Sequence, residues 1–126
     1  MTDLRTTSGP ETDPGTLRAE ARAWFEQEWD PDVSLGEWWE RLAESRWGFP
    51  TWSPEWYGRG LSSQQAGIVT EERVRVGAFG PPSGIGVMMA GPTIAGHGTE
   101  DQKRRFLPAM VSGKEIWCQL FSEPGA

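Results

Sequence analysis

The chain of 126 residues has one cysteine, one histidine and no apolar run of membrane-spanning length. The single cysteine, Cys118, excludes an intramolecular disulfide and suits a reducing compartment. The single histidine, His97, excludes a His-based metal cluster, and we predict no metal site. No signal-peptide pattern opens the chain, and no segment reaches the length of about 18 apolar residues that a membrane span needs. We therefore expect a cytoplasmic protein that has no membrane partner.

Basic residues are also scarce. Twelve Lys and Arg face 18 Asp and Glu, which gives a formal net charge of −6. This balance argues against nucleic acid as a partner, because nucleic-acid binding needs a basic patch or stripe. No glycine loop of Walker or Rossmann spacing is present to hold a phosphate. The length predicts one domain, large enough to bury about two-thirds of its unfolded surface.

Tryptophan, by contrast, is abundant. The chain has eight, and seven of them lie between Trp24 and Trp56. Each indole contributes a large apolar area and one N–H donor that needs a partner. We interpret these residues as a tryptophan-rich core together with surface that packs on other domains.

Apolar spacing predicts helices along most of the chain. Residues 1–15 are almost without apolar side chains and predict a disordered lead. Thr16 is the expected N-cap of the first helix, which ends before Pro31. Ser-x-x-Glu or Ser-x-x-Gln capping boxes then open helices at Ser34 and Ser62. The helix after Ser34 is expected to run to about Ser45, with Gly48 as its C-terminal stop, and Gly77 is expected to close the helix after Ser62.

The next segment, Gly84–Gly96, is apolar and uncharged but full of small residues. Glycine costs about 1 kcal/mol in a helix relative to alanine, so a helix forms here only if something else buries it. The small residues also allow another backbone or a ligand to approach closely. Thr99 then caps a last helix, which Pro108 should kink or divide.

Residues 115–122 are the one convincing strand in the pattern. The predicted fold is therefore all-α, a bundle of four to five helices that ends in one orphan β-strand. A lone strand is not stable in water. We therefore expect a sheet beyond residue 126.

No catalytic constellation emerges from the residues. His97 lies in a Gly-His-Gly corner and is interpreted as a turn residue. Cys118 has apolar neighbours and is interpreted as a buried, inert thiol. Glu71 and Glu72 share a helix with Arg73 and Arg75, which favours a solvated face with helix-supporting ion pairs.

Three segments, in this order and spacing, are similar to the acyl-CoA dehydrogenase family. They are Pro54–Ser62, then His97–Pro108 with Gly113 following, and Gln119–Ala126. The resemblance covers nearly all of residues 16–126 and implies the N-terminal helical domain of a larger flavoenzyme. It divides the chain into a lead (1–15), a helical domain (16–114) and the start of a middle β-domain (115–126). The Gly-Ser-Asp that continues the last motif in the family would follow Ala126.

The resemblance also implies a chemistry. In this family, FAD takes a hydride from the β-carbon of an acyl-CoA while a glutamate removes the α-proton. The matching segment would place Gln119, Leu120, Phe121 and Ser122 along the flavin ring. The glycine-rich stretch would line the pocket for the acyl tail, with Met88, Met89 and Thr93 as candidate contacts. An electron-transfer flavoprotein is the implied acceptor, and the full-length form is expected to be a homo- or hetero-oligomer.

The catalytic glutamate of the family has no counterpart in this chain, so we assign no catalytic residue. Most of the FAD site is missing as well, and we expect the chain to be inactive alone. Two alternatives stay open. One is a non-catalytic helical interaction module that associates with a partner chain, and the other is a poorly folded truncation product that aggregates through its strand edge.

Overall fold

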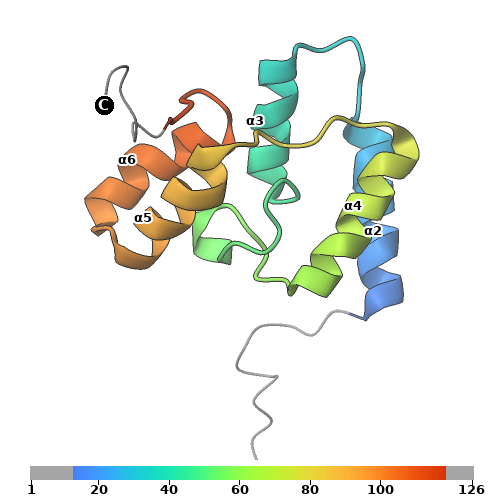
Figure 1. Ribbon diagram of the computed structural model, residues 1–126. Coiled ribbons are helices and arrows are strands. Elements are labelled where there is room, and N and C mark those ends of the chain that lie inside the picture. Colours follow the sequence, from blue (N-terminus) through green and yellow to red (C-terminus); the bar gives the residue numbers. More distant parts are fainter. Residues whose placement is uncertain (1–12, 119–126) are drawn as a thin grey trace, which may run out of the picture.

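The computed structural model describes residues 13–118, and within them the fold is all-α (Figure 1). The helical elements are α2 (Pro14–Glu28), α3 (Leu35–Ser45), the 3-10 turn η1 (Pro54–Trp56), α4 (Ser63–Val76), the π-helical turn η2 (Gly86–Ala90), α5 (Gly91–His97) and α6 (Glu100–Val111). The predicted helical bundle is confirmed. Residues 115–118 of the predicted strand carry no strand, and its remaining residues lie outside the described part. No helix within residues 13–118 has the length and hydropathy to cross a membrane.

The helix boundaries follow local capping chemistry. Ser62 and Thr99 each form the predicted capping box, with Gln65 and Gln102 respectively. The predicted N-cap Thr16 is wrong. α2 begins earlier because Asp13 accepts a hydrogen bond from the Thr16 backbone N–H at 3.1 Å and Pro14 fits the first helical position.

Two further helix boundaries test the predictions, and one of them differs from expectation. α3 ends at Ser45, as expected, and Arg46 rather than a glycine takes the left-handed conformation (φ 68°) at its C-cap. α6 runs through Pro108 to Val111 without being divided. Pro108 lies in the last part of the helix, where its missing N–H removes one hydrogen bond and few residues remain to be displaced.

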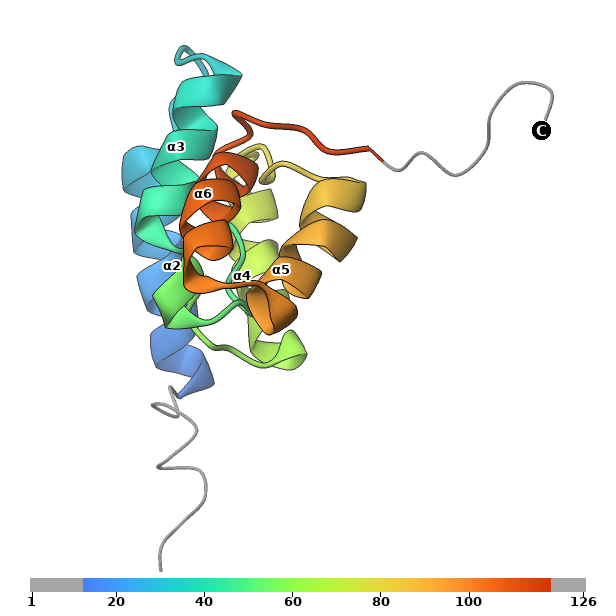
Figure 2. The same cartoon turned by 90° about the vertical axis from the view of Figure 1, so that its left-hand side faces the viewer.

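The side chains form two apolar clusters. In the first, α2, α3 and α4 enclose buried residues that include Phe25, Trp38 and Leu42. In the second, η2, α5 and α6 pack with the loop of residues 49–56 around Leu107 and Met110. Figures 1 and 2 show α2 and α4 side by side, with α5 and α6 as a separate layer.

Two adjacent tryptophans of α3 join these clusters. Trp38 donates its indole N–H to the Phe79 carbonyl at 2.8 Å, and Trp39 donates to the Gly80 carbonyl at 3.0 Å. Trp39 also packs so closely on Gly113, just after α6, that a Cβ there would lie 2.1 Å from its ring. The predicted tryptophan-rich core is therefore present, and its indole donors fix the segment between α4 and η2.

Glu72 of α4 ties α4 to α2. Its side chain is 0% exposed, and its carboxylate receives Arg18 at 2.6 Å and Arg22 at 2.8 Å, both from α2, and Arg75 at 3.2 Å. The prediction of a solvated face is wrong for Glu72, because α2 covers it. Hydrogen bonds from Arg22 and then Arg18 lower the pKa of Glu72 from 4.5 to about 2 against the opposing effect of burial.

We expect Glu72→Gln to lower the free energy of unfolding by about 2 kcal/mol, because charge-assisted hydrogen bonds from α2 are lost. Urea unfolding of the chain near neutral pH measures this loss. Glu71→Gln is the matched control, since Glu71 is exposed and meets only Arg18. It should change the free energy by less than about 1 kcal/mol.

The effect should depend on pH. Because folding lowers the pKa of Glu72, the stabilisation is complete above pH 4.5 and is lost as the pH falls toward about 2. The difference between the native chain and Glu72→Gln should shrink over that range. A difference that stays constant with pH would show that the carboxylate charge is not what joins the two helices.

Candidate functional site

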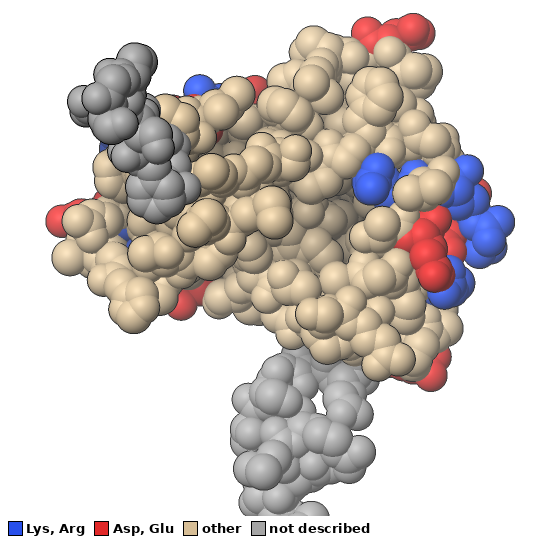
Figure 3. Space-filling view, viewed as in Figure 1, with Lys and Arg blue, Asp and Glu red and all other residues tan. Residues whose placement is uncertain are grey.

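One face of the molecule is almost free of charge. Figure 3 shows neutral side chains across its centre, whereas the Lys, Arg, Asp and Glu side chains gather over α2 and α4 and along the rim. η2 and α5 lie at this face (Figure 1). Met88 and Met89 of η2 are 73% and 52% exposed. Packing in the core therefore does not explain these two methionines.

The small residues let two indoles pack directly on the η2–α5 backbone. A Cβ at Gly91 would lie 2.6 Å from the Trp52 ring, and a Cβ at Gly86 would lie 3.2 Å from Trp117. The Gly91 N–H bonds to the Gly86 carbonyl, which closes the π-helical turn. The sequence predicted that a backbone or a ligand could approach this segment closely. In the structure, the side chains of Trp52 and Trp117 occupy that position. π-helical turns of this kind are frequent at functional sites.

Two of the three predicted substrate residues, Met89 and Thr93, line one open hollow of about 310 Å³. Its other lining residues are Ile85, Ala90, Ile94, Trp117 and Cys118. The Thr93 hydroxyl donates to the Met89 carbonyl at 2.7 Å, so its oxygen can still accept a hydrogen bond. Cys118 is exposed, so the prediction of a buried thiol is wrong.

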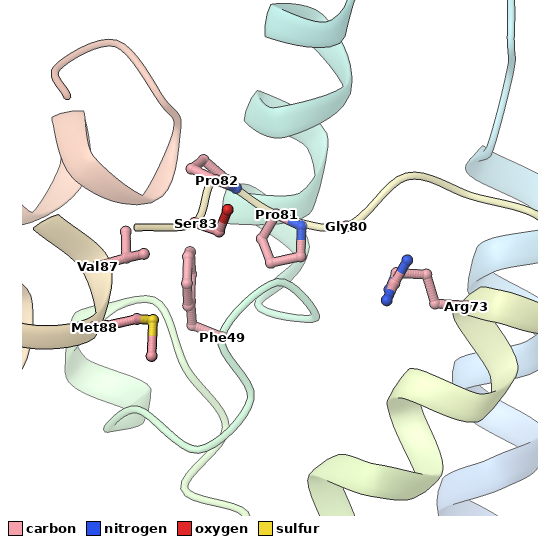
Figure 4. Close-up of a pocket in the computed structure, with 8 residues that line it drawn as sticks. All are labelled: Phe49, Arg73, Gly80, Pro81, Pro82, Ser83, Val87 and Met88. Atoms are coloured by element: carbon pink, nitrogen blue, oxygen red, sulfur yellow. The ribbon is translucent and has the colours of Figure 1, made fainter. Parts of the chain in front are cut away.

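The third predicted residue, Met88, lies in a different hollow of about 510 Å³, which we call the Arg73 groove (Figure 4). Its lining residues are Phe49, Arg73, Gly80, Pro81, Pro82, Ser83, Val87 and Met88. Consecutive side chains of the η2 turn thus enter two hollows, so the structure does not bring all three predicted residues together.

Sequence reasoning did not assign Arg73 to a site. It leaves α4 toward the groove, and its guanidinium donates to the Ala78 carbonyl at 2.9 Å. Burial lowers the pKa of Arg73 below the usual value of a guanidinium. The run Glu71–Arg75 gave no signal that one of its arginines turns away from the ion pairs of α2. The sequence does not distinguish Arg73 from Arg75, whereas in the fold Arg75 pairs with Glu72 and Arg73 lines the groove.

The predicted flavin contacts Gln119, Leu120, Phe121 and Ser122 lie outside the described residues. The described chain reaches Cys118 after leaving the end of α6 (Figure 2). The polar side-chain groups that line the hollow beside Trp117 are the Thr93 hydroxyl, the Trp117 indole N–H and the Cys118 thiol.

The comparison with family models places this helical domain. Residues 14–114 match the model for the acyl-CoA dehydrogenase N-terminal domain. The chain belongs to the acyl-CoA dehydrogenase family. The uncharged face and its two hollows therefore belong to the N-terminal domain of an oxidoreductase family.

Individual relatives agree with this assignment. The chain is 44% identical to the acyl-CoA dehydrogenase FadE34 of Mycobacterium tuberculosis over 68% of its length, and 40% identical to IpdE1 of the same organism over 71%. It is 36% identical over 55% of its length to the mitochondrial long-chain specific acyl-CoA dehydrogenase of Sus scrofa. The matched region covers only 12%, 23% and 16% of these proteins, respectively. No solved structure gives a significant match.

We expect Gly91→Ala to destabilise the chain by about 1–3 kcal/mol, because the new methyl group overlaps the Trp52 ring. Trp52 is itself held against Phe49, with their ring centroids 5.0 Å apart, so it cannot move aside freely. Urea unfolding measures the change.

Gly96→Ala in the same helix is the matched control. A Cβ at Gly96 meets nothing within 4 Å, so this substitution should stabilise the chain by up to about 1 kcal/mol through helix propensity. If both alanines had the same effect, close packing of Trp52 would not be what requires glycine at position 91.

Proposed function

We propose that this chain is the N-terminal part of an FAD-dependent acyl-CoA dehydrogenase that oxidises the α,β-bond of an acyl-CoA thioester. The observation that carries the proposal is the uncharged face, where exposed Met88 and Met89 adjoin the segment that leads to residues 119–122. An exposed methionine pair in a chain with this many charges is suited to contact an apolar ligand. The family membership supplies the reaction.

In this proposal the described residues bind and exclude water rather than react. Met89, Ile94 and Trp117 give the acyl tail an apolar wall, and the Thr93 hydroxyl offers an acceptor at its edge. FAD, when bound, would supply the acceptor for the hydride from the β-carbon, and the family resemblance would assign Gln119–Ser122 to contacts with its ring. The base that removes the α-proton belongs to the part of the enzyme outside this chain. No residue of 1–126 is proposed as catalytic.

The domain division into 1–15, 16–114 and 115–126 stays a prediction, as do the cytoplasmic location and the oligomeric full-length form. The acceptor for electrons from the flavin is proposed to be an electron-transfer flavoprotein. It would not contact the two hollows, because these face the acyl group.

The isolated chain should not retain flavin, because the flavin contacts proposed in this chain are limited to Gln119–Ser122. Mixing the purified chain with FAD and removing free flavin by gel filtration tests this. Stoichiometric flavin eluting with the chain would overturn the proposal that it is inactive alone.

The complete product of the source gene should contain flavin and reduce an electron-accepting dye with an acyl-CoA. In that enzyme, Met89→Lys should lower kcat/KM by about tenfold or more, because a buried ammonium in an apolar site is costly. Val74→Lys is the control, since Val74 is exposed but lines neither hollow. A colourless product without dehydrogenase activity would contradict the proposed function.

The alternative is a non-catalytic helical module that associates with a partner chain. The same exposed apolar side chains favour it, because such surfaces mark protein interfaces. The mass of the purified chain and of any complex it forms, measured by sedimentation, distinguishes the interaction module from the enzyme fragment. A tight complex with a second protein that lacks any flavin would support the alternative and count against the enzyme.

A further inference from the structure

Arg73 differs from the other arginines of the described chain in what surrounds its charge. Six arginines form ion pairs with carboxylates there, namely Arg18, Arg22, Arg41, Arg75, Arg104 and Arg105. Arg59 instead donates to two backbone carbonyls and lies 3.3 Å from the centre of the Trp47 ring. Arg46 also lacks a carboxylate partner there, but it donates to the Pro54 carbonyl and lies 5.7 Å from the centre of the Tyr57 ring. Arg73 makes one hydrogen bond, to Ala78, and has no carboxylate within 4 Å among residues 13–118.

The groove in front of Arg73 is otherwise uncharged. Figure 4 shows the guanidinium at one end, with Phe49 and Met88 at the other and Pro81 and Pro82 along the side. The Ser83 hydroxyl is the one other polar side-chain group in the lining. A guanidinium carries five N–H donors, so Arg73 keeps donors for a ligand after bonding to Ala78.

We propose that the Arg73 groove binds the far end of an acyl group that carries a carboxylate, so that the substrate is the mono-CoA thioester of a dicarboxylic acid. This inference rests on the proposed function and specifies its substrate class. The apolar lining takes the methylene chain, and Arg73 forms a charge-assisted, two-point contact with the terminal carboxylate. An ordinary acyl tail would leave the guanidinium half-buried without a counter-charge, which is unfavourable. Burial already lowers the pKa of Arg73, and no nearby carboxylate raises it.

The test uses the complete enzyme and matched pairs of thioesters. Each pair consists of a straight-chain acyl-CoA and the mono-CoA thioester of the dicarboxylic acid of the same length, from short to long chains. The measured quantity is the ratio of kcat/KM between the two members of a pair. Arg73→Leu should lower this ratio by about tenfold or more, because the carboxylate loses its partner while the methylene contacts remain.

Two further variants separate recognition from structure. Arg73→Lys keeps the charge and should retain part of the preference for the dicarboxylic substrate. Arg104→Leu removes an exposed charge that pairs with Asp101 and should leave the ratio unchanged. Melting temperatures of all variants show whether each is folded, and Arg73→Lys keeps the test valid if Arg73→Leu is not.

The outcomes are distinct. An enzyme that oxidises straight-chain acyl-CoA and none of the dicarboxylic thioesters would overturn this inference and leave the proposed function intact. So would equal losses for both members of a pair in Arg73→Leu, since they would indicate a structural role. An enzyme that oxidises no acyl-CoA would overturn the proposed function, and this inference with it.

Discussion

The pair of indole hydrogen bonds from α3 is the interaction on which the site depends. Trp38 lies in the α2–α3–α4 cluster, while Trp39 reaches Gly113 beside α6. Both donate to consecutive carbonyls, those of Phe79 and Gly80, and these residues lead directly into the proline-lined wall of the Arg73 groove. Both clusters and the segment between them are therefore in contact with the same helix, α3. The groove keeps its shape because α3 holds its backbone.

Charge is arranged to leave this face neutral. The carboxylate of Glu72 draws Arg18, Arg22 and Arg75 into one group between α2 and α4. Arg73, on the same helix, points the other way into the groove. A single helix thus supplies both the buried carboxylate that pairs with α2 and the one cation of the Arg73 groove. In the proposed function, an apolar ligand would meet a surface with little competing hydration, and Arg73 would add a single point of polar recognition.

Much of the fold could be predicted from sequence, because local rules decide it. Capping boxes at Ser62 and Thr99 and the left-handed Gly77 follow from hydrogen bonding within a few residues. The buried state of Glu72 could not be predicted, because its partners on α2 are 50 or more positions away. The site was predictable only in part. Composition identified the η2–α5 segment as a candidate for ligand contact. In the structure a π-helical turn places Met88 and Met89 in separate hollows. The ordinary helical period does not predict this separation.

The most direct test of the account is a crystal structure of the complete gene product with an acyl-CoA bound. The account predicts that the acyl group lies against η2, with Met88 and Met89 buried by it and by the rest of the enzyme. An acyl group bound elsewhere, with both methionines still exposed to solvent, would contradict the assignment of this face to substrate.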